Sequence, residues 1–445
     1  MTGNVGEGIQ SILDQDLYKF CMQMAVMEHY PEVMVNYSFI NRNPEMKFNY
    51  RAFEWLVIKI DELTELRLRE EEYEYLKSEC PYLSTDYLDY LRNFRYFPKD
   101  QVQSKFVVEE KTETLETRSI YSINPTNIRK SESQVNPDTM GHIDITIKGY
   151  WTQVILYEVQ ILSLISEAYF KFVDLDWDMT CQADKIREKA TQLLENGCKF
   201  SEFGTRRRRS YNVQDLIVKE LGDTYKAYLK KHPEHDENKG QVSGTSNVYL
   251  AKKYGLSPSG TVGHEWTMGI AALENTFLTG NKLALYKWHA SFRGELGIGL
   301  TDTFGIKSFF ENFDYFLSSI YSGIRHDSGN PDHLIDLAVN HYHDMGIDYS
   351  KKRIVFSDSL NVTRAISLND TCRKRGIGCA FGIGTFFTND FHMKSNPSQN
   401  SPALNIVIKL VECGGVGCVK LSDDPGKHTG RRSDINRALI ELGLK

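Results

Sequence analysis

The chain has 445 residues and carries 53 basic and 59 acidic side chains, which gives a formal net charge of −6. This length predicts two or three domains, although one α/β barrel can hold about 250 residues. With 41% hydrophobic and 25% charged residues, the composition excludes disordered, collagen-like and coiled-coil proteins. Because the chain lacks a general basic field, we expect neither nucleic acid nor an acidic membrane as its partner.

The sequence predicts neither a secretory signal nor a membrane span. The first ten residues, MTGNVGEGIQ, contain neither a basic nor an apolar leader segment. The most apolar stretch, 149–170, is interrupted by Glu158 and Glu167, so we expect no membrane span. The eight cysteines form no CxxC pair, which indicates reduced thiols. We therefore expect a cytoplasmic protein, with the nucleus as a second compartment.

The first 150 residues predict a mixed α+β domain. Apolar residues recur at helical spacing over 11–29, and a proline follows that pattern. Strand-like runs come next at 33–40 and at 142–151. Between them, residues 124–141 are polar and contain two prolines, which predicts a surface loop.

Residues 151–400 predict a different architecture, in which short apolar runs alternate with helical patterns. Most of these runs end in small polar clusters, which read FGTRRRR, SGTSN, SGTVGH, LTDTFG, RHDSGNP, FSDSLN and FGIGT. Repetition of strand, turn and helix is typical of parallel βα units. Seven such turns favour a closed α/β barrel with its site at the carboxyl ends of the strands, and an open doubly wound sheet is the alternative. We expect residues 401–445 to form a final strand and a tail that pack on the N-terminal domain.

The turn FGIGT suggests a phosphate site. It places Gly382, Gly384 and Thr385 between a predicted strand and a helix start. Glycines allow the backbone to approach an anion, and free N–H groups at a helix N-terminus bind phosphate. The third glycine of a dinucleotide fingerprint is absent. The alternative is a glycine turn that only closes a βα unit.

Two further turns carry hydroxyls and carboxylates. Ser357 follows one predicted strand, while Arg325, Asp327 and Ser328 follow another. Hydroxyls suit phosphate, and a carboxylate can hold ribose hydroxyls or Mg²⁺. These residues could instead be helix caps, for which Ser and Asp are favoured. Three such turns on neighbouring strands favour a phosphosugar site.

An arginine run and a histidine complete the candidate set. Arg206–Arg209 are consecutive, so they point in different directions and at most two of them can face a site. A guanidinium suits a carboxylate or a phosphate, although the run could also be a solvated patch or a localisation signal. His264 follows a small-residue turn. It could be a base, a metal ligand or a nucleophile, or simply a turn residue.

Taken together, these motifs resemble the nicotinate phosphoribosyltransferases, and most closely the fungal ones. The similarity is carried by LDQDLYKF at 13–20, LYEVQILSLISEAYFKFVDLDWD at 156–178, FSEFGTRRRRS at 200–210, GTVGHEW at 260–266, DSGNP at 327–331, SDSLNV at 357–362 and FGIGTFFTNDF at 381–391. The resemblance implies an irregular α/β barrel with a second, smaller α+β domain formed mainly by the N-terminal region. It also implies a homodimer that converts nicotinate and phosphoribosyl pyrophosphate into nicotinate mononucleotide and pyrophosphate, with Mg²⁺ and with ATP as co-substrate, in the salvage of nicotinate for NAD biosynthesis.

The same resemblance implies roles for individual residues. His264 matches the histidine that ATP phosphorylates, and Arg325 and Asp327 match further catalytic positions. The nicotinate site corresponds to Tyr18, Phe203, Arg206, Ser246, Thr261 and Arg325, and the phosphoribosyl pyrophosphate site to Asp302, Ser328, Ser357, Gly382, Gly384 and Thr385. Asp327 also matches a contact to Mg²⁺ with pyrophosphate. Related enzymes that use nicotinamide carry an aspartate at the place of Ser246, so a neutral serine favours the acid.

The chemistry suits these residue types, because the ring nitrogen of nicotinate displaces pyrophosphate through a cation-like transition state. Such a reaction needs positioning and charge stabilisation more than a strong base. Two other functions compete with this one. A barrel phosphosugar isomerase or aldolase would share the glycine turns but would need no arginine run. A regulatory or nucleic-acid-associated protein would use Arg206–Arg209, and the net charge of −6 argues against it.

Overall fold

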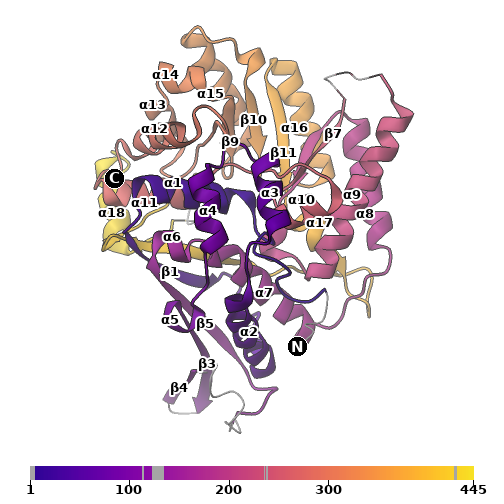
Figure 1. The fold of residues 1–445 in the computed structure, drawn as a ribbon, viewed down its shortest axis with the longest axis vertical. Coiled ribbons are helices and arrows are strands. Elements are labelled where there is room, and N and C mark those ends of the chain that lie inside the picture. The colour runs from indigo at the N-terminus through magenta and orange to yellow at the C-terminus, as the bar shows by residue number, and fades with distance from the viewer. Residues whose placement is uncertain (1–5, 113–114, 123–134, 235, 237–238, 425–427) are drawn as a thin grey trace.

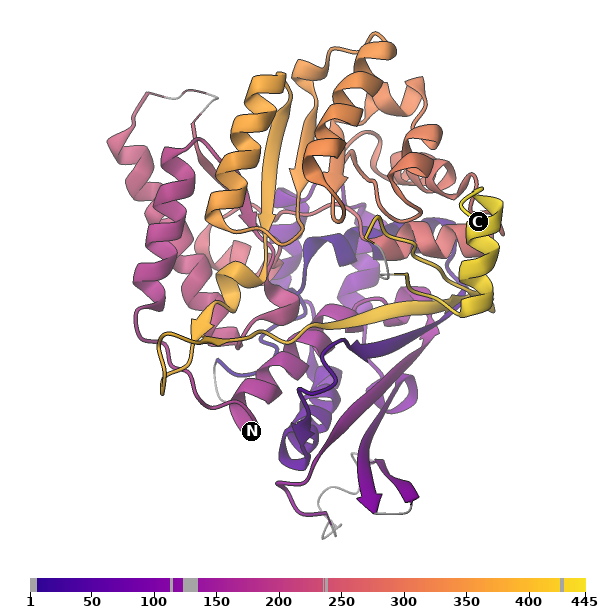
Figure 2. The same cartoon turned by 180° about the vertical axis from the view of Figure 1, so that it is seen from behind.

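The computed structural model describes residues 1–445 except 1–5, 113–114, 123–134, 235, 237–238 and 425–427. It contains an antiparallel sheet and a parallel sheet, each with helices packed against it (Figures 1 and 2). Most of the predicted loop at 124–141 lies outside the described residues. Within the described part, no helix is long and apolar enough to cross a bilayer.

The antiparallel sheet joins the two ends of the chain. Its strand order is β15 (Val416–Gly417), β14 (Ile406–Cys413), β1 (Met34–Asn41), β5 (Met140–Tyr150), β3 (Val102–Thr112) and β4 (Leu115–Ser122), and β2 (Phe48–Asn49) pairs with β5. In β1, Val35 and Tyr37 are buried and alternate with more exposed residues, as expected for a sheet with one covered face. Figure 2 shows β14 lying alongside β1. β14, which comes from the C-terminal part of the chain, is therefore an inner strand of the N-terminal sheet.

Helices cover this sheet and connect it to the rest of the chain. They are α1 (Leu17–His29), α2 (Tyr50–Glu62), η1 (Leu63–Glu65), α3 (Glu70–Glu79), α4 (Thr85–Asn93) and α5 (Pro98–Gln101). The predicted first helix, 11–29, begins only at Leu17. Residues before it extend along the segment after β7, where Leu17 N–H donates to the carbonyl of Ser246 and Val248 N–H to that of Gln15. This long-range pairing competes with helix formation at the start of the pattern.

The parallel sheet has the order β7 (Gln241–Thr245), β6 (Lys199–Glu202), β11 (Gly378–Ile383), β10 (Arg353–Phe356), β9 (Gly323–His326) and β8 (Ile298–Leu300). The helices that follow or flank these strands are α8 (Gln182–Glu195), η2 (Thr205–Arg207), α9 (Tyr211–Lys231), α10 (Val248–Tyr254), α11 (His264–Leu273), α12 (Gly280–Phe292), α13 (Ile306–Asn312), α14 (Tyr315–Ile320), α15 (Pro331–Asp344), η3 (Tyr349–Lys351), α16 (Val362–Arg375) and α17 (Thr385–Thr388). A hairpin, β12 (Phe391–His392) with β13 (Asn400–Ser401), and α18 (Arg432–Glu441) complete the fold. The α/β class is confirmed.

The sheet is irregular because only six of the seven predicted turns follow a strand. The segment that leads to GTVGH runs beside the end of β7, where Ser259 N–H donates to the carbonyl of Thr245 at 2.9 Å. A Cβ on Gly244, whose φ is +143°, would lie 1.9 Å from the carbonyl oxygen of Ser257, so only glycine permits this approach. Within the described residues, the hydrogen-bonded order ends at β7 on one side and at β8 on the other.

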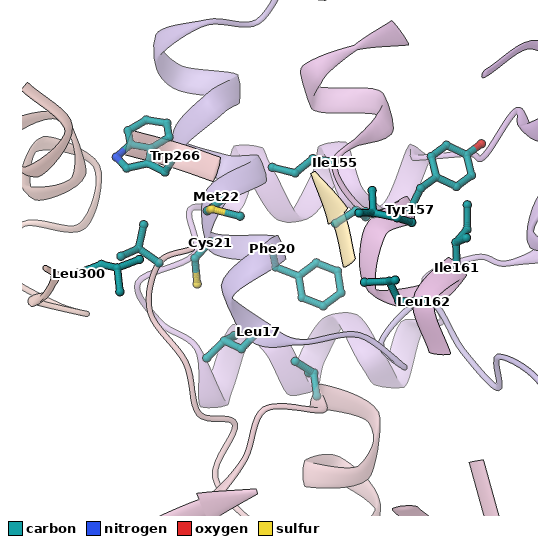
Figure 3. Packing of buried hydrophobic residues seen from close by; sticks show 14 of the residues in the cluster. Leu17, Phe20, Cys21, Met22, Ile155, Tyr157, Ile161, Leu162, Trp266 and Leu300 are labelled. Carbon is teal, nitrogen blue, oxygen red and sulfur yellow. The ribbon is translucent and has the colours of Figure 1, made fainter. Parts of the chain in front are cut away.

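A buried helix connects the two sheets. The apolar stretch at 149–170 forms the end of β5, α6 (Trp151–Val154) and most of α7 (Tyr157–Phe172), and nearly all of α7 is buried. Figure 3 shows side chains of α1 and α7 in one apolar cluster that also includes Trp266 and Leu300. This core contains residues from all three predicted domains, 1–150, 151–400 and 401–445, so it does not mark where one ends and the next begins. The domain bounds stay a prediction. The rigid core fixes the polar groups that these helices carry into the site.

Candidate active site

The site is a cavity of about 330 Å³ between the carboxyl ends of the parallel strands and β14. Most of the residues expected at the site line it, namely Tyr18, Phe203, Arg206, His264, Arg325, Asp327, Ser328, Ser357, Gly382, Gly384 and Thr385. These residues come from distant parts of the chain. The topology brings them together because parallel strands end at the same edge of their sheet.

His264 is the first residue of α11, and the carboxylate of Asp302 holds its ring in place. Its Nε2 lies 2.7 Å from Asp302 Oδ1 and 3.7 Å from Asp327 Oδ2. Burial, followed by the positive charge of Lys420, lowers the pKa of His264, so the imidazole is neutral at neutral pH. A neutral ring that donates Nε2–H to Asp302 keeps the lone pair on Nδ1.

Asp302 is a buried anchor, not part of the cavity lining. Its Oδ2 accepts a hydrogen bond from Ser328 Oγ at 2.6 Å and an ion pair from Lys420 Nζ at 2.8 Å. Burial opposes ionisation of this carboxyl, but His264 and Lys420 outweigh it and hold the pKa well below its usual range. Asp302 is therefore a charged group that orients His264, and a direct contact with ribose stays untested.

Arg325 joins three segments around the cavity. Its guanidinium donates to Ser357 Oγ at 2.8 Å, to Asp327 Oδ1 at 2.9 Å and to the carbonyl oxygen of Val262 at 3.2 Å. Ser357 in turn donates to Asp327 Oδ1 at 2.5 Å. Burial works against the charge on Asp327, yet Arg325 and His264 lower its pKa to about 2. Arg325 thus holds the ends of β9 and β10 and the loop before α11 in one arrangement.

The arginine run divides into two pairs, as the sequence predicts for consecutive residues. Arg206 and Arg207 line the cavity. Arg208 is fully buried and forms an ion pair with Asp14 at 2.7 Å, whereas Arg209 donates to Asn389 at 2.8 Å and to Ser401. The second pair therefore fixes the N-terminal segment and the C-terminal part of the chain.

The two expected aromatic residues reach the cavity from distant parts of the sequence. Tyr18 lies in the first turn of α1, and Phe203 follows β6. Glu202 supports this turn by accepting hydrogen bonds from Thr245 Oγ1 at 2.6 Å and from the backbone of Gly204. A Cβ on Gly382 would lie 2.3 Å from the Phe203 ring, so the glycine turn and the ring fit only without a side chain there.

Two other expected residues do not line the cavity. Ser246 is buried, and its hydroxyl donates to Asp16 Oδ1 at 2.7 Å. Thr261 belongs to the loop before α11, of which Gly263 reaches the cavity. Both were expected to contact nicotinate directly, whereas Ser246 contacts Asp16, which does not line the cavity either.

Several charged residues at the cavity were not expected from the sequence. The cations are Arg42, Arg207, Lys409 and Lys420, and the carboxylates are Glu158, Glu265 and Asp358. Burial and the neighbouring charge of Lys420 lower the pKa of Lys409 to about 8. Glu158 interrupts an otherwise apolar helix, which was the available signal. Lys409 lies within a strand-like run and gave no comparable signal.

In the cluster of His264, Asp302 and Asp327, one carboxylate oxygen is available to bind a divalent cation. His264, Asp302 and Asp327 offer ligand atoms within 4.8 Å of one another. Both oxygens of Asp302 already have partners, and Oδ1 of Asp327 accepts two hydrogen bonds. Oδ2 of Asp327 lies beyond hydrogen-bond distance from His264. One carboxylate oxygen suits Mg²⁺, which usually takes its other ligands from water and phosphates.

Comparison with known proteins identifies the family. Residues 198–441 match the model of the nicotinate phosphoribosyltransferase family, and residues 13–118 match its N-terminal domain. The nicotinate phosphoribosyltransferase of Saccharomyces cerevisiae is 42% identical over 98% of this chain and 95% of its own length. That of Methanosarcina mazei is 41% identical over 98% of this chain and 99% of its own.

Solved structures agree with the sequence comparison. A nicotinate phosphoribosyltransferase structure from S. cerevisiae superposes with a TM-score of 0.88 and 40% identity, covering 99% of this chain and 100% of the other. One from Porphyromonas gingivalis superposes with a TM-score of 0.81 and 34% identity, covering 98% and 100%. The chain therefore belongs to the nicotinate phosphoribosyltransferase family.

Proposed function

We propose that this protein transfers the phosphoribosyl group of phosphoribosyl pyrophosphate to nicotinate and couples the transfer to ATP hydrolysis through a phosphorylated His264. The pyridine nitrogen forms a bond to the anomeric carbon, and the bond from that carbon to pyrophosphate breaks. The products are nicotinate mononucleotide, which serves NAD biosynthesis, and pyrophosphate. The observation that carries this proposal is the cavity that brings His264, Arg206, Arg325 and a glycine turn together.

The nicotinate end is supported by aromatic and guanidinium groups. Tyr18 and Phe203 provide flat surfaces for a pyridine ring, and stacking would direct its nitrogen. Arg206 has a partly exposed side chain, and its Nη1 lies 3.7 Å from Glu158. It can therefore turn a donor pair towards a carboxylate, as a planar guanidinium does best.

The phosphoribosyl pyrophosphate end is supported by hydroxyls, backbone amides and cations. Gly382 and Gly384 precede α17 and Thr385 begins it, while Ser328 and Ser357 lie on neighbouring turns. Mg²⁺ fits beside Asp327, which we propose as its protein ligand. When bound, the ion would neutralise charge that develops on the leaving pyrophosphate.

His264 is the proposed phosphoryl acceptor. Its Nδ1 would attack the γ-phosphorus of ATP, forming an N–P bond while the bond to the β-phosphate oxygen breaks and ADP leaves. Water later attacks the phosphorus, the N–P bond breaks, and inorganic phosphate is released. Asp302 would stabilise the ring through Nε2–H during both steps, since it lies 2.7 Å away and is charged.

A homodimer, which the resemblance implies, and a cytoplasmic or nuclear location, which the sequence pattern predicts, also remain proposals. Light scattering of the purified protein at several concentrations would measure the mass, and cell fractionation would measure the location.

A direct assay tests the proposed activity. The protein is incubated with nicotinate, phosphoribosyl pyrophosphate and Mg²⁺, with and without ATP, and the mononucleotide is measured by chromatography. We expect product in both reactions and faster formation with ATP. Replacement of nicotinate by nicotinamide provides the matched control, and absence of product from nicotinate in both reactions would contradict the proposal.

A further inference from the structure

We propose that Lys19 is a positioning residue that connects the nicotinate-binding arginine, Arg206, with the phosphoryl acceptor, His264, through two buried glutamates. This inference rests on the proposed function and goes beyond it, because Lys19 itself does not line the cavity. The chain of contacts runs from Arg206 to Glu158, from Glu158 to Lys19, and from Lys19 to Glu265.

Lys19 is a fully buried cation with two carboxylate partners. Its side chain is 0% exposed, and Nζ lies 2.5 Å from Glu158 Oε2 and close to Glu265 Oε2. Lysine is almost never fully buried unless it is paired, because leaving water costs several kcal/mol. A lysine in this position therefore fixes both carboxylates, and it also follows Tyr18 in the first turn of α1.

The first branch reaches the nicotinate end. Glu158 lies near the start of the buried helix α7, and its Oε1 lies 3.7 Å from Arg206 Nη1. Burial alone would raise the pKa of Glu158, but Lys19 and Arg206 lower it, so the carboxylate stays charged. Each oxygen of Glu158 thus faces a different cation, and the position of Arg206 depends on Lys19.

The second branch reaches the phosphoryl acceptor. Glu265 follows His264 directly in the first turn of α11. Its Oε1 accepts hydrogen bonds from Tyr37 Oη at 2.5 Å and from Trp151 Nε1 at 2.7 Å, while Oε2 faces Lys19. Both oxygens are therefore held by groups from the core. This fixes the start of α11 and with it the backbone of His264.

The charges of the four groups balance. Lys19 and Arg206 carry two positive charges, and Glu158 and Glu265 carry two negative ones. Removal of Lys19 alone would leave two carboxylates beside a single guanidinium at the wall that receives the carboxylate of nicotinate. Like charges at such distances oppose binding, and a buried group without its partner loses its fixed position.

The test compares four variants with the wild type. We expect Lys19→Met to raise the KM for nicotinate about tenfold and to slow labelling by γ-labelled ATP about tenfold, with the KM for phosphoribosyl pyrophosphate within about twofold. Glu158→Gln should change mainly the KM for nicotinate, and Glu265→Gln mainly the labelling rate. The double variant Lys19→Met/Glu265→Gln restores the charge balance. It should recover the KM for nicotinate to within about threefold of wild type while labelling stays slow.

Controls separate a positioning role from a general loss of structure. Lys282→Met removes a surface lysine, paired with Asp314 at 3.0 Å, and should change none of the three measurements. Thermal unfolding shows which variants fold. If Lys19→Met does not fold, the two glutamine variants and the double variant still give the predicted separation of the two measurements.

The result that would overturn the inference is equally specific. Unchanged KM and labelling in Lys19→Met would remove Lys19 from the site. Losses of similar size in all three measurements, with no recovery in the double variant, would make Lys19 a purely structural residue. A wild type that forms no mononucleotide from nicotinate would instead contradict the proposed function, so the two failures are distinguishable.

Discussion

The cavity has two walls that differ in charge and in construction. The strand-end wall consists of the turns after β6, β9, β10 and β11 and carries hydroxyls, backbone amides and Asp327. The C-terminal wall consists of β14 and residues 418–422 and contributes Lys409 and Lys420, with Arg42 beside it at the end of β1. The strand-end wall therefore combines directed hydrogen bonds with the guanidinium groups of Arg206, Arg207 and Arg325, whereas the C-terminal wall offers two lysines beside Arg42.

This difference shows that two separate parts of the fold contribute different interactions with an anionic substrate. Donors at the ends of strands are held by short hydrogen bonds, as in the contacts of Arg325 with Ser357 and Asp327. The lysines of the C-terminal wall lie in β14 and in the segment after β15, and burial, followed by the charge of Lys420, lowers the pKa of Lys409 to about 8. We expect substitutions in the strand-end wall to affect chemistry and geometry, and those in the C-terminal wall to affect charge and its dependence on pH.

The largest expected effect is that of His264→Ala, at the start of α11 beside the strand-end wall. The variant loses the ring nitrogen that we propose as the phosphoryl acceptor, while Asp302 keeps its contacts with Ser328 and Lys420. We expect a folded protein that is not labelled by γ-labelled ATP and whose remaining transfer activity is independent of ATP. Labelling that is labile in acid and stable in base measures this in the wild type.

A matched control for that experiment is His343→Ala. His343 lies on α15, and its side chain is 77% exposed. The control should label as the wild type does. Equal labelling of His264→Ala and wild type would assign the phosphate to another residue.

The next largest effect is that of Arg325→Lys. Lysine keeps the charge but loses the planar set of donors that reaches Asp327, Ser357 and Val262 together. We expect kcat/KM for nicotinate to fall about tenfold to a hundredfold, with a smaller change in thermal stability. Steady-state kinetics with each substrate varied measures this. A wild-type KM for both substrates would make Arg325 a structural cap.

The strand-end wall is also the part of the site that the sequence predicts best. The turns at Gly382 and Ser357 follow short apolar runs, and this local pattern places them at the strand ends without long-range information. Tyr18 and His264 were assigned largely through the resemblance, since a lone aromatic residue or histidine carries little signal. The fold class was predictable for the same reason, because strand, turn and helix alternate locally.

The C-terminal wall could not be predicted in this way. Lys409 lies in the strand-like run IVIKL, where a charged residue is normally expected on the exposed face. Its contribution depends on the pairing of β14 with β1, which are separated by most of the chain. Lys19 gave no signal either, since its helical pattern did not show that a lysine would be buried with two glutamates. In both cases the position of the lysine depends on contacts between segments that are far apart in the sequence.

A third prediction concerns the pH dependence of the C-terminal wall. A lysine loses its charge as the pH rises through its pKa, so Lys409 should be mostly neutral at pH 9 and mostly charged at pH 7. We expect the wild-type KM for phosphoribosyl pyrophosphate to rise by up to about tenfold between these values. Lys409→Arg should flatten this rise, because a guanidinium stays charged throughout.

The KM for nicotinate, measured over the same pH range, is the internal reference, because the carboxylate of nicotinate does not titrate between pH 7 and pH 9. Initial rates at several pH values provide both constants. An identical rise in Lys409→Arg would show that another group titrates, and the charge of the C-terminal wall would then not depend on Lys409.

The smallest expected effect is that of Ser246→Asp, which lies behind the strand-end wall. Its hydroxyl donates to Asp16, and burial raises the pKa of Asp16 while Arg206 and Ser246 oppose that change. A second carboxylate here would reduce the positive potential at Arg206 without touching the cavity. We expect kcat/KM for nicotinate to fall about fivefold, or about 1 kcal/mol, and the ratio of nicotinamide to nicotinate use to rise. Ser246→Ala removes the same hydrogen bond without adding charge and should leave the ratio unchanged, so an equal shift in both variants would assign base selection to the geometry of Asp16 and not to charge.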